Sequence, residues 1–315
     1  MLNNNKKILV SGSIVYDRIM TFPGFFKDHI LPDKIHILNI SFTLGKVEES
    51  FGGTGANIVY NLSLLKQRAI LLGLVGKDFE PYRLWLEKNK IDTSYIRKNK
   101  NELTASAYVM TDQADNQITG FYPGPLDVDY CQSVFKIKNI GLAIISPDFK
   151  LRMLEYARIY NQLKVPYIFD PGQAIPSFTA AELKKIIAKA KVLIGNDYEI
   201  ELILNMLKIN QASLLNLVDT LVITKGVIGS EIFSSGKKIK IKAAKVISTI
   251  DPTGAGDAYR AGMIKGLIGA FDWKKTGQLA GTIAAYAVEK QGTQAHRFNL
   301  REFNQRYKNN FKEEI

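Results

Sequence analysis

A glycine-rich segment that ends in a carboxylate is the part of this chain best suited to chemistry. In the stretch DPTGAGDAYRAG, Gly254, Ala255 and Gly256 stand directly before Asp257. The small residues predict the start of a helix, whose first amide groups lack partners within the helix and attract negative charge. Phosphoryl transfer needs such stabilisation, together with a residue that orients or deprotonates the nucleophile. The segment therefore favours phosphoryl transfer with Asp257 as the base. A helix N-cap without a catalytic role is the alternative.

Two earlier segments could bind the acceptor of such a reaction. Asp17 follows the first predicted strand, where the loops of an α/β sheet collect ligands, although an aspartate there could also cap a turn. The Gly52-Gly53 pair precedes Thr54 and Asn57 at the predicted start of another helix. Asn57 could hold a substrate there, or it could face solvent at a flexible helix entry.

Two later segments could serve a nucleotide. Asn196 and Glu199 lie three residues apart and share one helix face after a predicted strand, although Asn196 could act only as the helix N-cap. Residues 224–226 (Thr-Lys-Gly) end another predicted strand at a tight turn. Backbone groups of that turn could approach a nucleotide, or the turn could simply close a hairpin.

Alternating strands and helices must position these residues. Six apolar segments have the length and composition of strands: KKILVSGSI, AILLGLVG, GLAIIS, VPYIFD, KVLIGN and TLVITKG. Helical patterns separate most of them, and one begins near Thr54 while another begins at Asp78 with Pro81 in its first turn. This order predicts an α/β fold with a mostly parallel sheet flanked by helices.

Two segments interrupt that order and predict a small β-sheet lid. Residues 17–50 show strand-like alternation at His36 to Ile40, and residues 104–122 carry strand-like runs on both sides of a turn. Both leave the main sheet near the crevice where such folds bind ligands. We therefore expect a catalytic domain formed by residues 1–16, 51–103 and 123–315, with a lid formed by residues 17–50 and 104–122.

Composition limits the other classes of function. The chain has 315 residues, 46% of them hydrophobic, and a formal net charge of +12. Its basic residues are scattered without an arginine-rich stripe, so we expect no nucleic-acid binding. No apolar run approaches the roughly 20 residues of a membrane helix, and the three histidines lack metal-ligand spacing. A single cysteine and no signal-peptide pattern predict a cytoplasmic protein.

The motifs together resemble those of the ribokinase family, also called the PfkB sugar kinases. DPTGAGD resembles the second signature of the family, and residues 52–57 (GGTGAN) resemble the first. Residues 196–199 resemble its N-x-x-E element, and residues 224–229 resemble its T-x-G-x-x-G nucleotide loop. These motifs follow the family's order over nearly the whole chain. The resemblance implies a ribokinase-like α/β fold with a β lid, and ATP as the phosphoryl donor.

The resemblance also implies roles for individual residues. Asp257 would be the base, and the loop of Gly254, Ala255 and Gly256 would hold the transferred phosphoryl group. ATP would contact a set of polar and glycine residues: Asn196, Thr224, Lys225, Gly226, Gly229, Gly254 and Gly256. Glu199 would place Mg²⁺ through water, and Asp251 would border a site for a monovalent cation such as K⁺. Residues 292–294 (Gly-Thr-Gln) would lie near that cation loop and the adenine of ATP.

Within the family, the chain resembles the bacterial adenosine kinases. GSIVYDRIMTFPGFF, GFYPG and DPTGAGDAYRAG carry this likeness. It implies that the ribose and base contact a set of residues from both domains: Ser13, Asp17, Ser41, Gly53, Asn57, Phe121 and Gln173. Ala107 and Ala174 depart from that branch, which has a base-stacking Phe and a second Gln there. Strand alternation would point the neighbouring Tyr108 to the opposite face.

We therefore expect ATP-dependent phosphorylation of a sugar hydroxyl, first of all the 5′-hydroxyl of adenosine, giving AMP and ADP in purine salvage. A broader purine nucleoside kinase and a ribokinase-type sugar kinase are the alternatives among enzymes. A nucleoside-binding protein without turnover is the alternative outside them, and the intact Asp257 disfavours it. Walker A, protein-kinase and G-x-G-x-x-G dinucleotide motifs are absent. We expect a monomer or a homodimer, with the lid as the candidate interface.

Overall fold

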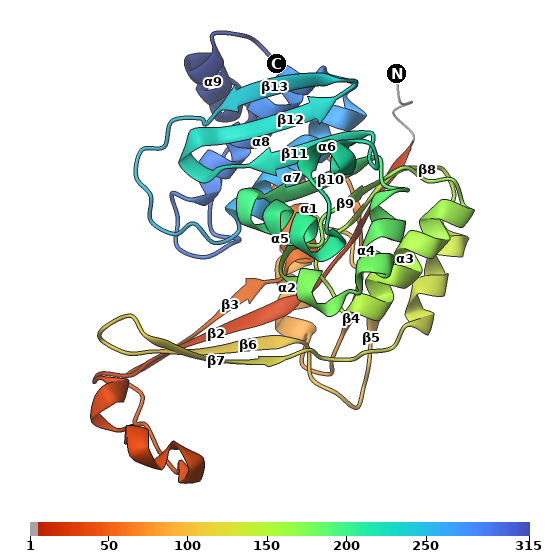
Figure 1. Ribbon diagram of the computed structural model, residues 1–315. Coiled ribbons are helices and arrows are strands. Elements are labelled where there is room, and N and C mark those ends of the chain that lie inside the picture. Colours follow the sequence, from red (N-terminus) through yellow and green to blue (C-terminus); the bar gives the residue numbers. More distant parts are fainter. Residues whose placement is uncertain (1–5) are drawn as a thin grey trace.

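The computed structural model describes residues 6–315 and contains two sheets (Figure 1). The larger sheet has nine strands in the order β13-β12-β11-β10-β9-β8-β1-β4-β5. All neighbouring pairs from β11 to β5 are parallel, whereas β12 and β13 pair antiparallel at one edge. The strands of this sheet are β1 (Lys7–Ser11), β4 (Ile70–Val75), β5 (Ile96–Lys98), β8 (Ile140–Ile145), β9 (Tyr167–Phe169), β10 (Val192–Asn196), β11 (Thr220–Thr224), β12 (Gly229–Ser234) and β13 (Lys237–Lys242). The expected mostly parallel sheet is confirmed.

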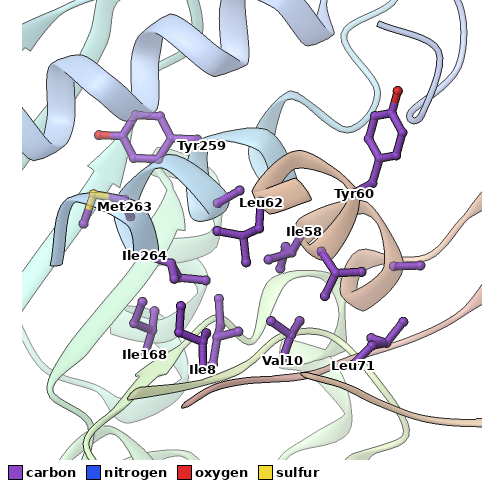
Figure 2. Packing of buried hydrophobic residues seen from close by; sticks show 14 of the residues in the cluster. Ile8, Val10, Ile58, Tyr60, Leu62, Leu71, Ile168, Tyr259, Met263 and Ile264 are labelled. Atoms are coloured by element: carbon purple, nitrogen blue, oxygen red, sulfur yellow. The ribbon is translucent and has the colours of Figure 1, made fainter. Parts of the chain in front are cut away.

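Helices cover both faces of this sheet because its central strands are apolar on both sides. In β1, Ile8 and Val10 belong to one buried cluster, whereas Leu9 between them belongs to another. The first cluster includes residues of α1 (Thr54–Leu64), α2 (Glu80–Lys88), α7 (Ala255–Ile268) and α8 (Trp273–Ala287), and Figure 2 shows its centre. The second includes residues of α3 (Lys150–Gln162), α4 (Ala180–Ile187), α5 (Asp197–Leu207) and α6 (Gln211–Leu215). The C-terminal α9 (Leu300–Phe311) packs against α8 through Phe303. Within residues 6–315, none of these helices is long and apolar enough to cross a membrane.

A separate four-stranded sheet extends away from the body of the molecule (Figure 1). Its strand order is β3-β2-β6-β7, with antiparallel outer pairs and a parallel pair of β2 and β6 at the centre. The strands are β2 (Val15–Thr21), β3 (Lys46–Gly52), β6 (Ser106–Thr111) and β7 (Gln117–Tyr122). The expected small second sheet is therefore present.

The strand expected at His36 to Ile40 is wrong. Residues Pro32–Ile37 form 3-10 turns, and residues 38–44 have no regular structure. The alternation of apolar residues there finds no neighbouring strand, because β2 ends at Thr21 and β3 begins only at Lys46, and an unpaired strand leaves its backbone groups unsatisfied. Instead, the rings of Phe22, Phe26 and Phe42 pack together at this end of the sheet.

Candidate active site

The site begins at the N-terminus of α7, where the sequence predicted a helix start. Gly254 is the N-cap and has φ +80°, a left-handed conformation that favours glycine. The amide of Ala255 donates to the carbonyl of Pro252 (3.2 Å), whereas the amides of Gly256 and Asp257 have no hydrogen-bond partner among the described residues. Two donors at the positive end of α7 therefore remain free to bind an anion.

Asn57 on α1 contacts Asp257 directly. Its Nδ2 donates to Asp257 Oδ2 at 2.8 Å, which is the single hydrogen bond that the described residues give to this carboxylate. Asn57 is only 3% exposed, so the alternative that it faces solvent is wrong. The contact joins the first and second glycine motifs, which lie 200 residues apart in the chain.

The surroundings of Asp257 raise the pKa of its carboxyl group to about 7. Burial is the main cause, and the negative charges of Asp170 and Asp17 act in the same direction. The hydrogen bond from Asn57 and the charge of Arg260 oppose this shift. A carboxyl group that ionises near neutral pH suits a general base.

A buried ion pair next to Asp257 was not predicted from the sequence. Arg260, one turn along α7, donates through Nε and Nη2 to the two oxygens of Asp170 at 2.8 and 2.7 Å, and also to the carbonyl of Gly256 (3.3 Å). Asp170 directly follows β9. The sequence held two signals for this ion pair: a basic residue at a buried helix position within DAYRAG, and an acidic residue at the end of a strand. Such a bidentate pair holds the loop of residues 254–256 in place.

Asp17 lies on β2 within the small sheet and does not cap a turn. Burial raises the pKa of its carboxyl group to about 6, and its side chain lies against Gly52, where any Cβ would collide with Asp17 Oδ2. The charge of Asp17 contributes to the raised pKa of Asp257, so the two carboxylates influence one another. Asp17 is thus the part of the small sheet that faces the α7 site.

Asp17, Ala107 and Phe121 form one row across the small sheet. Asp17 is the register partner of Ala107, and Ala107 is the partner of Phe121, so the three side chains share a face. Phe121 is 60% exposed on that face. Tyr108 lies on the opposite face, where Arg18 donates to its hydroxyl at 3.0 Å, as alternation predicted.

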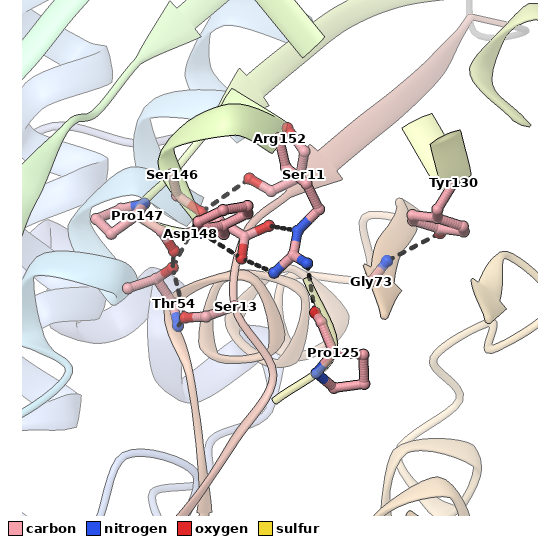
Figure 3. Close-up of polar contacts among 11 residues, drawn as sticks. Ser11, Ser13, Thr54, Gly73, Pro125, Tyr130, Ser146, Pro147, Asp148 and Arg152 are labelled. Atoms are coloured by element: carbon pink, nitrogen blue, oxygen red, sulfur yellow. Dashed lines mark hydrogen bonds and ion pairs between the residues drawn. The ribbon is translucent and has the colours of Figure 1, made fainter. Parts of the chain in front are cut away.

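Ser13 and Gly53 meet at the junction between the two sheets. Ser13 Oγ accepts from the amide of Thr54 at 3.0 Å, and Gly53, with φ +92°, leaves no room for a Cβ beside the Ser13 carbonyl. Thr54 Oγ1 also donates to the carbonyl of Pro147 at 2.9 Å, which fixes the start of α1 on the loop after β8 (Figure 3). This junction therefore has a structural role as well as a position next to Asp17.

Two expected acceptor residues are exposed and contact none of the other candidate residues through a hydrogen bond of their side chains among residues 6–315. Ser41 is exposed in the segment beyond the ends of β2 and β3, and Asp17 lies four residues, about 13 Å, back along β2 from that end. Gln173 is exposed three residues after Asp170, on the side of the main sheet where β9 ends.

The expected nucleotide residues occupy loops at the ends of β10 and β11. Asn196 caps α5 and forms a reciprocal capping box with Glu199, with hydrogen bonds of 2.7 and 2.8 Å. This N-cap role is the alternative that the sequence left open. β11 and β12 form an antiparallel hairpin across residues 225–228, and Lys225 Nζ pairs with Glu231 at 2.8 Å. In that loop Gly226 and Gly229 have φ of +52° and +112°, and Val227 is 92% exposed. Thr224 Oγ1 makes only a long contact of 3.5 Å to the Gly195 carbonyl.

The charged groups near these loops are the candidates for holding cations. Glu199 uses Oε2 for the capping bond and lies 3.9 Å from Arg260, while burial raises the pKa of its carboxyl group. Its Oε1 accepts no hydrogen bond from residues 6–315, so this atom is the one available to a metal-bound water. Asp251 accepts from the amides of Thr253 and Gly292, both at 2.9 Å. Burial alone would raise the pKa of Asp251, but these bonds hold it below its ordinary value. No group of three acidic, His or Cys side chains in the described chain is arranged to hold a metal alone.

Residues 293 and 294 lie against Asn57. Thr293 Oγ1 and Gln294 Nε2 each lie 2.9 Å from Asn57 Oδ1. The preceding Gly292 donates to Asp251, so residues 292–294 do lie near Asp251. The contacts of Thr293 and Gln294 with Asn57 were not predicted, because nothing in their spacing links them to residue 57.

Several known proteins resemble this chain over most of its length. A family model described as pfkB family carbohydrate kinase matches residues 5–298. The nucleoside kinase of Methanothermobacter thermautotrophicus is 32% identical over 302 residues, which cover 93% of this chain and 93% of that protein. The structure of Burkholderia thailandensis nucleoside kinase in complex with inosine has a TM-score of 0.87 at 33% identity, covering 98% of this chain and 100% of that chain. The structure of that enzyme in complex with ADP-inosine has a TM-score of 0.84 at 36% identity, covering 98% and 97%.

Proposed function

The chain belongs to the pfkB family of carbohydrate kinases and is an ATP-dependent phosphotransferase acting on sugar hydroxyls, and we propose that its acceptor is a purine nucleoside. In this proposal the γ-phosphoryl group of ATP passes to the 5′-hydroxyl, so that adenosine gives AMP and ADP. The observation that carries it is the placement of Asp257 between the free amides of α7 and the Asp17 face of the small sheet. Phosphate and sugar groups can meet there.

Each side chain has a distinct task in the proposed reaction. Asp17 accepts hydrogen bonds from the ribose hydroxyls and so orients the 5′-hydroxyl toward Asp257. Asp257 takes the proton of that hydroxyl as its oxygen attacks the γ-phosphorus. The amides of Gly256 and Asp257 hold the phosphoryl oxygens, on which negative charge is concentrated during transfer. Arg260 keeps this loop in place through Asp170 and the Gly256 carbonyl.

The row of Asp17, Ala107 and Phe121 favours a purine without selecting one purine over another. The exposed ring of Phe121 offers a stacking surface, and Ala107 has no group that could read the base edge. We therefore propose that adenosine, inosine and guanosine are all accepted. The inosine complex of the Burkholderia relative supports this broader range.

The loops after β10 and β11 are the proposed site of ATP. Asn196, Thr224, Lys225, Gly226 and Gly229 would border the nucleotide there. When bound, Mg²⁺ would neutralise the charge of the transferring phosphates, with Glu199 reaching it through water. Asp251, held ionised by two amides, would attract a monovalent cation such as K⁺ to its loop.

A coupled assay for ADP formation tests the acceptor. The panel contains adenosine, inosine, guanosine, cytidine, ribose and fructose 6-phosphate at matched concentrations, with Asp257→Asn as the control for contaminating kinases. We expect kcat/KM for the three purine nucleosides to exceed that for ribose by at least about tenfold, because the stacked base adds binding energy. A higher kcat/KM for ribose or fructose 6-phosphate would identify a sugar kinase instead. The absence of turnover with every acceptor would contradict the proposal.

A further inference from the structure

The Asn57 side chain can stabilise or destabilise the charged form of Asp257, depending on which end of its amide faces the carboxylate. The two ends of an asparagine amide have nearly the same shape, but one end donates hydrogen bonds and the other accepts them. With Nδ2 toward Asp257, Asn57 stabilises the carboxylate. With Oδ1 there, it would repel the carboxylate. The neighbours of Asn57 must therefore decide its orientation.

A chain of hydrogen bonds, called the relay below, fixes this orientation. The indole Nε1 of Trp85 can only donate, and it lies 2.9 Å from Gln294 Oε1. Gln294 must therefore present its amide nitrogen on the other side, where Nε2 lies 2.9 Å from Asn57 Oδ1. Since Oδ1 is held there, Nδ2 of Asn57 faces Asp257 Oδ2 at 2.8 Å. The direction of every bond in the relay follows from the first one.

The second hydrogen of Gln294 is also bound. Nε2 lies 2.6 Å from the Tyr82 hydroxyl, which in turn donates to the carbonyl of Gly52 at 2.7 Å. Gln294 is only 5% exposed, so water does not compete for these groups. A flip of its amide would break the contacts with Trp85 and Asn57.

Thr293 cannot replace Gln294 in this role. Its hydroxyl lies 2.9 Å from Asn57 Oδ1 but also 3.1 Å from the carbonyl of Phe51. A hydroxyl has one hydrogen to donate, so it serves these two acceptors in turn, and as an acceptor it would tolerate either end of the Asn57 amide.

We infer that Gln294 is a positioning residue of the phosphotransferase reaction, which holds Asn57 with its amide nitrogen toward Asp257, and that Trp85 sets the direction of this relay. The inference rests on the role of Asp257 as the base. Without the relay, the Thr293 hydroxyl remains beside Asn57 Oδ1 and fits either end of the amide, so the hydrogen bond that favours the charged form of Asp257 weakens.

The other charged and polar groups around Asp257 do not mask the effect of the Asn57 hydrogen bond on its pKa. Arg260 on α7 lowers the pKa of Asp257, whereas its ion-pair partner Asp170 after β9 raises it, and Glu199 of α5 lies 3.9 Å from Arg260. Asp17 on β2 raises the pKa of Asp257, and Tyr82 on α2, whose own hydroxyl pKa lies well above its ordinary value, stays neutral. Asn57 on α1 is therefore the neutral donor that lowers the pKa of Asp257, against the rise caused by burial.

Two substitutions test the relay, each measured against a matched control. Gln294→Met keeps the volume but removes the amide with its acceptor and its donor, and Trp85→Phe keeps an aromatic ring but removes the indole donor. The control is Gln278→Met, because Gln278 on α8 is also 5% exposed and accepts from an aromatic residue, the Tyr307 hydroxyl at 2.7 Å, and makes no hydrogen bond to Asp257 or Asn57 within residues 6–315. The readouts are the pH dependence of kcat/KM for the nucleoside and the titration of Asp257 by carbon-13 NMR of labelled aspartate.

We expect the acid limb of the pH profile to move to higher pH by about one unit in Gln294→Met, with a smaller shift in the same direction in Trp85→Phe. The NMR titration of Asp257 should move by the same amount, whereas Gln278→Met should lose thermal stability alone. If Gln294→Met does not fold, Trp85→Phe carries the test.

Unchanged Asp257 titration in the folded relay variants would overturn the inference. A shift in Gln294→Met without one in Trp85→Phe would overturn the part assigned to Trp85. Failure of the base assignment is distinguishable from both, because an active Asp257→Asn enzyme would reject the base while the NMR titration would still report on the relay.

Discussion

At the scale of single residues, two carboxyl groups on either side of the boundary between the sheets have raised pKa values. Burial accounts for most of both shifts, to about 7 for Asp257 and about 6 for Asp17. A raised pKa gives a base with enough proton affinity to deprotonate a hydroxyl in the transition state, while neutral pH still keeps much of it ionised.

The pH dependence of activity follows from the shift of Asp257. The base must be ionised, so kcat/KM should rise with pH through about 7 and level off above it. Initial rates between pH 5 and 9 at fixed ionic strength measure this limb. A profile already flat from about pH 5 upward would show that Asp257 titrates as an ordinary carboxyl group or is not the base.

The same shift predicts how stability depends on pH. The folded protein keeps a proton on Asp257 up to about pH 7, whereas the unfolded chain releases it near the ordinary value of 3.8. The folded state therefore binds more protons in this range, and the free energy of unfolding falls as pH rises through it. Asp257→Asn removes this contribution, so its Tm should be at least equal to that of the wild type at pH 8. A clearly lower Tm would contradict the shift.

Asp17 should affect the acceptor and leave ATP alone. Asp17→Asn keeps the shape of the side chain but removes its charge, so KM for the nucleoside should rise roughly ten- to a hundredfold while KM for ATP changes little. Glu48→Gln is the matched control, because Glu48 lies on the same face of the small sheet and pairs with Lys46 near its far end. Equal rises in both KM values of Asp17→Asn would contradict the assignment.

At the scale of elements, the small sheet carries Asp17 and Phe121, whereas α1 and α7 carry Asn57 and Asp257. β2 and β3 join the body of the molecule at the junction of Ser13 and Gly53. Movement about this junction would bring the exposed face of Phe121 toward the α7 site and exclude water from the transferring phosphoryl group.

Hydrogen exchange can detect this closure. In residues 17–50 and 104–122 exchange should slow when adenosine or inosine is added, and should slow less with an ATP analogue alone, because the nucleoside contacts both sheets. Strand β13, at the far edge of the main sheet, is the internal control and should not change. Exchange in both segments that is unaffected by saturating nucleoside would reject their role as a lid.

At the scale of the whole molecule, local patterns predicted most of the fold. Apolar strand segments, the Thr54 helix start and Pro81 in the first turn of α2 all appear where the sequence indicated. The alternation at His36 to Ile40 misled because pairing, which decides strand formation, is not local. The small sheet was predicted, but its register, which aligns Asp17 with Ala107 and Phe121, required the structure.

Part of the site escaped prediction for the same reason. The glycine loop and Asp257 form one local motif, so sequence alone located them. The contacts of Arg260 with Asp170 and of Gln294 with Asn57 span 90 and 237 residues, and no spacing rule connects such positions. By contrast, the capping role of Asn196 depends only on neighbouring residues. It was one of the alternatives from the sequence, and it is present in the structure.

The most direct test of the account is the turnover of Asp257→Asn with the best acceptor of the panel. Asparagine fills the same space, but its amide nitrogen cannot accept a proton and its carbonyl oxygen is a very weak base. We expect kcat to fall by at least about 10²-fold while KM for ATP stays within a few fold, since the amides of α7 remain. Retention of more than about a tenth of the wild-type kcat would contradict the assignment of Asp257 as the base.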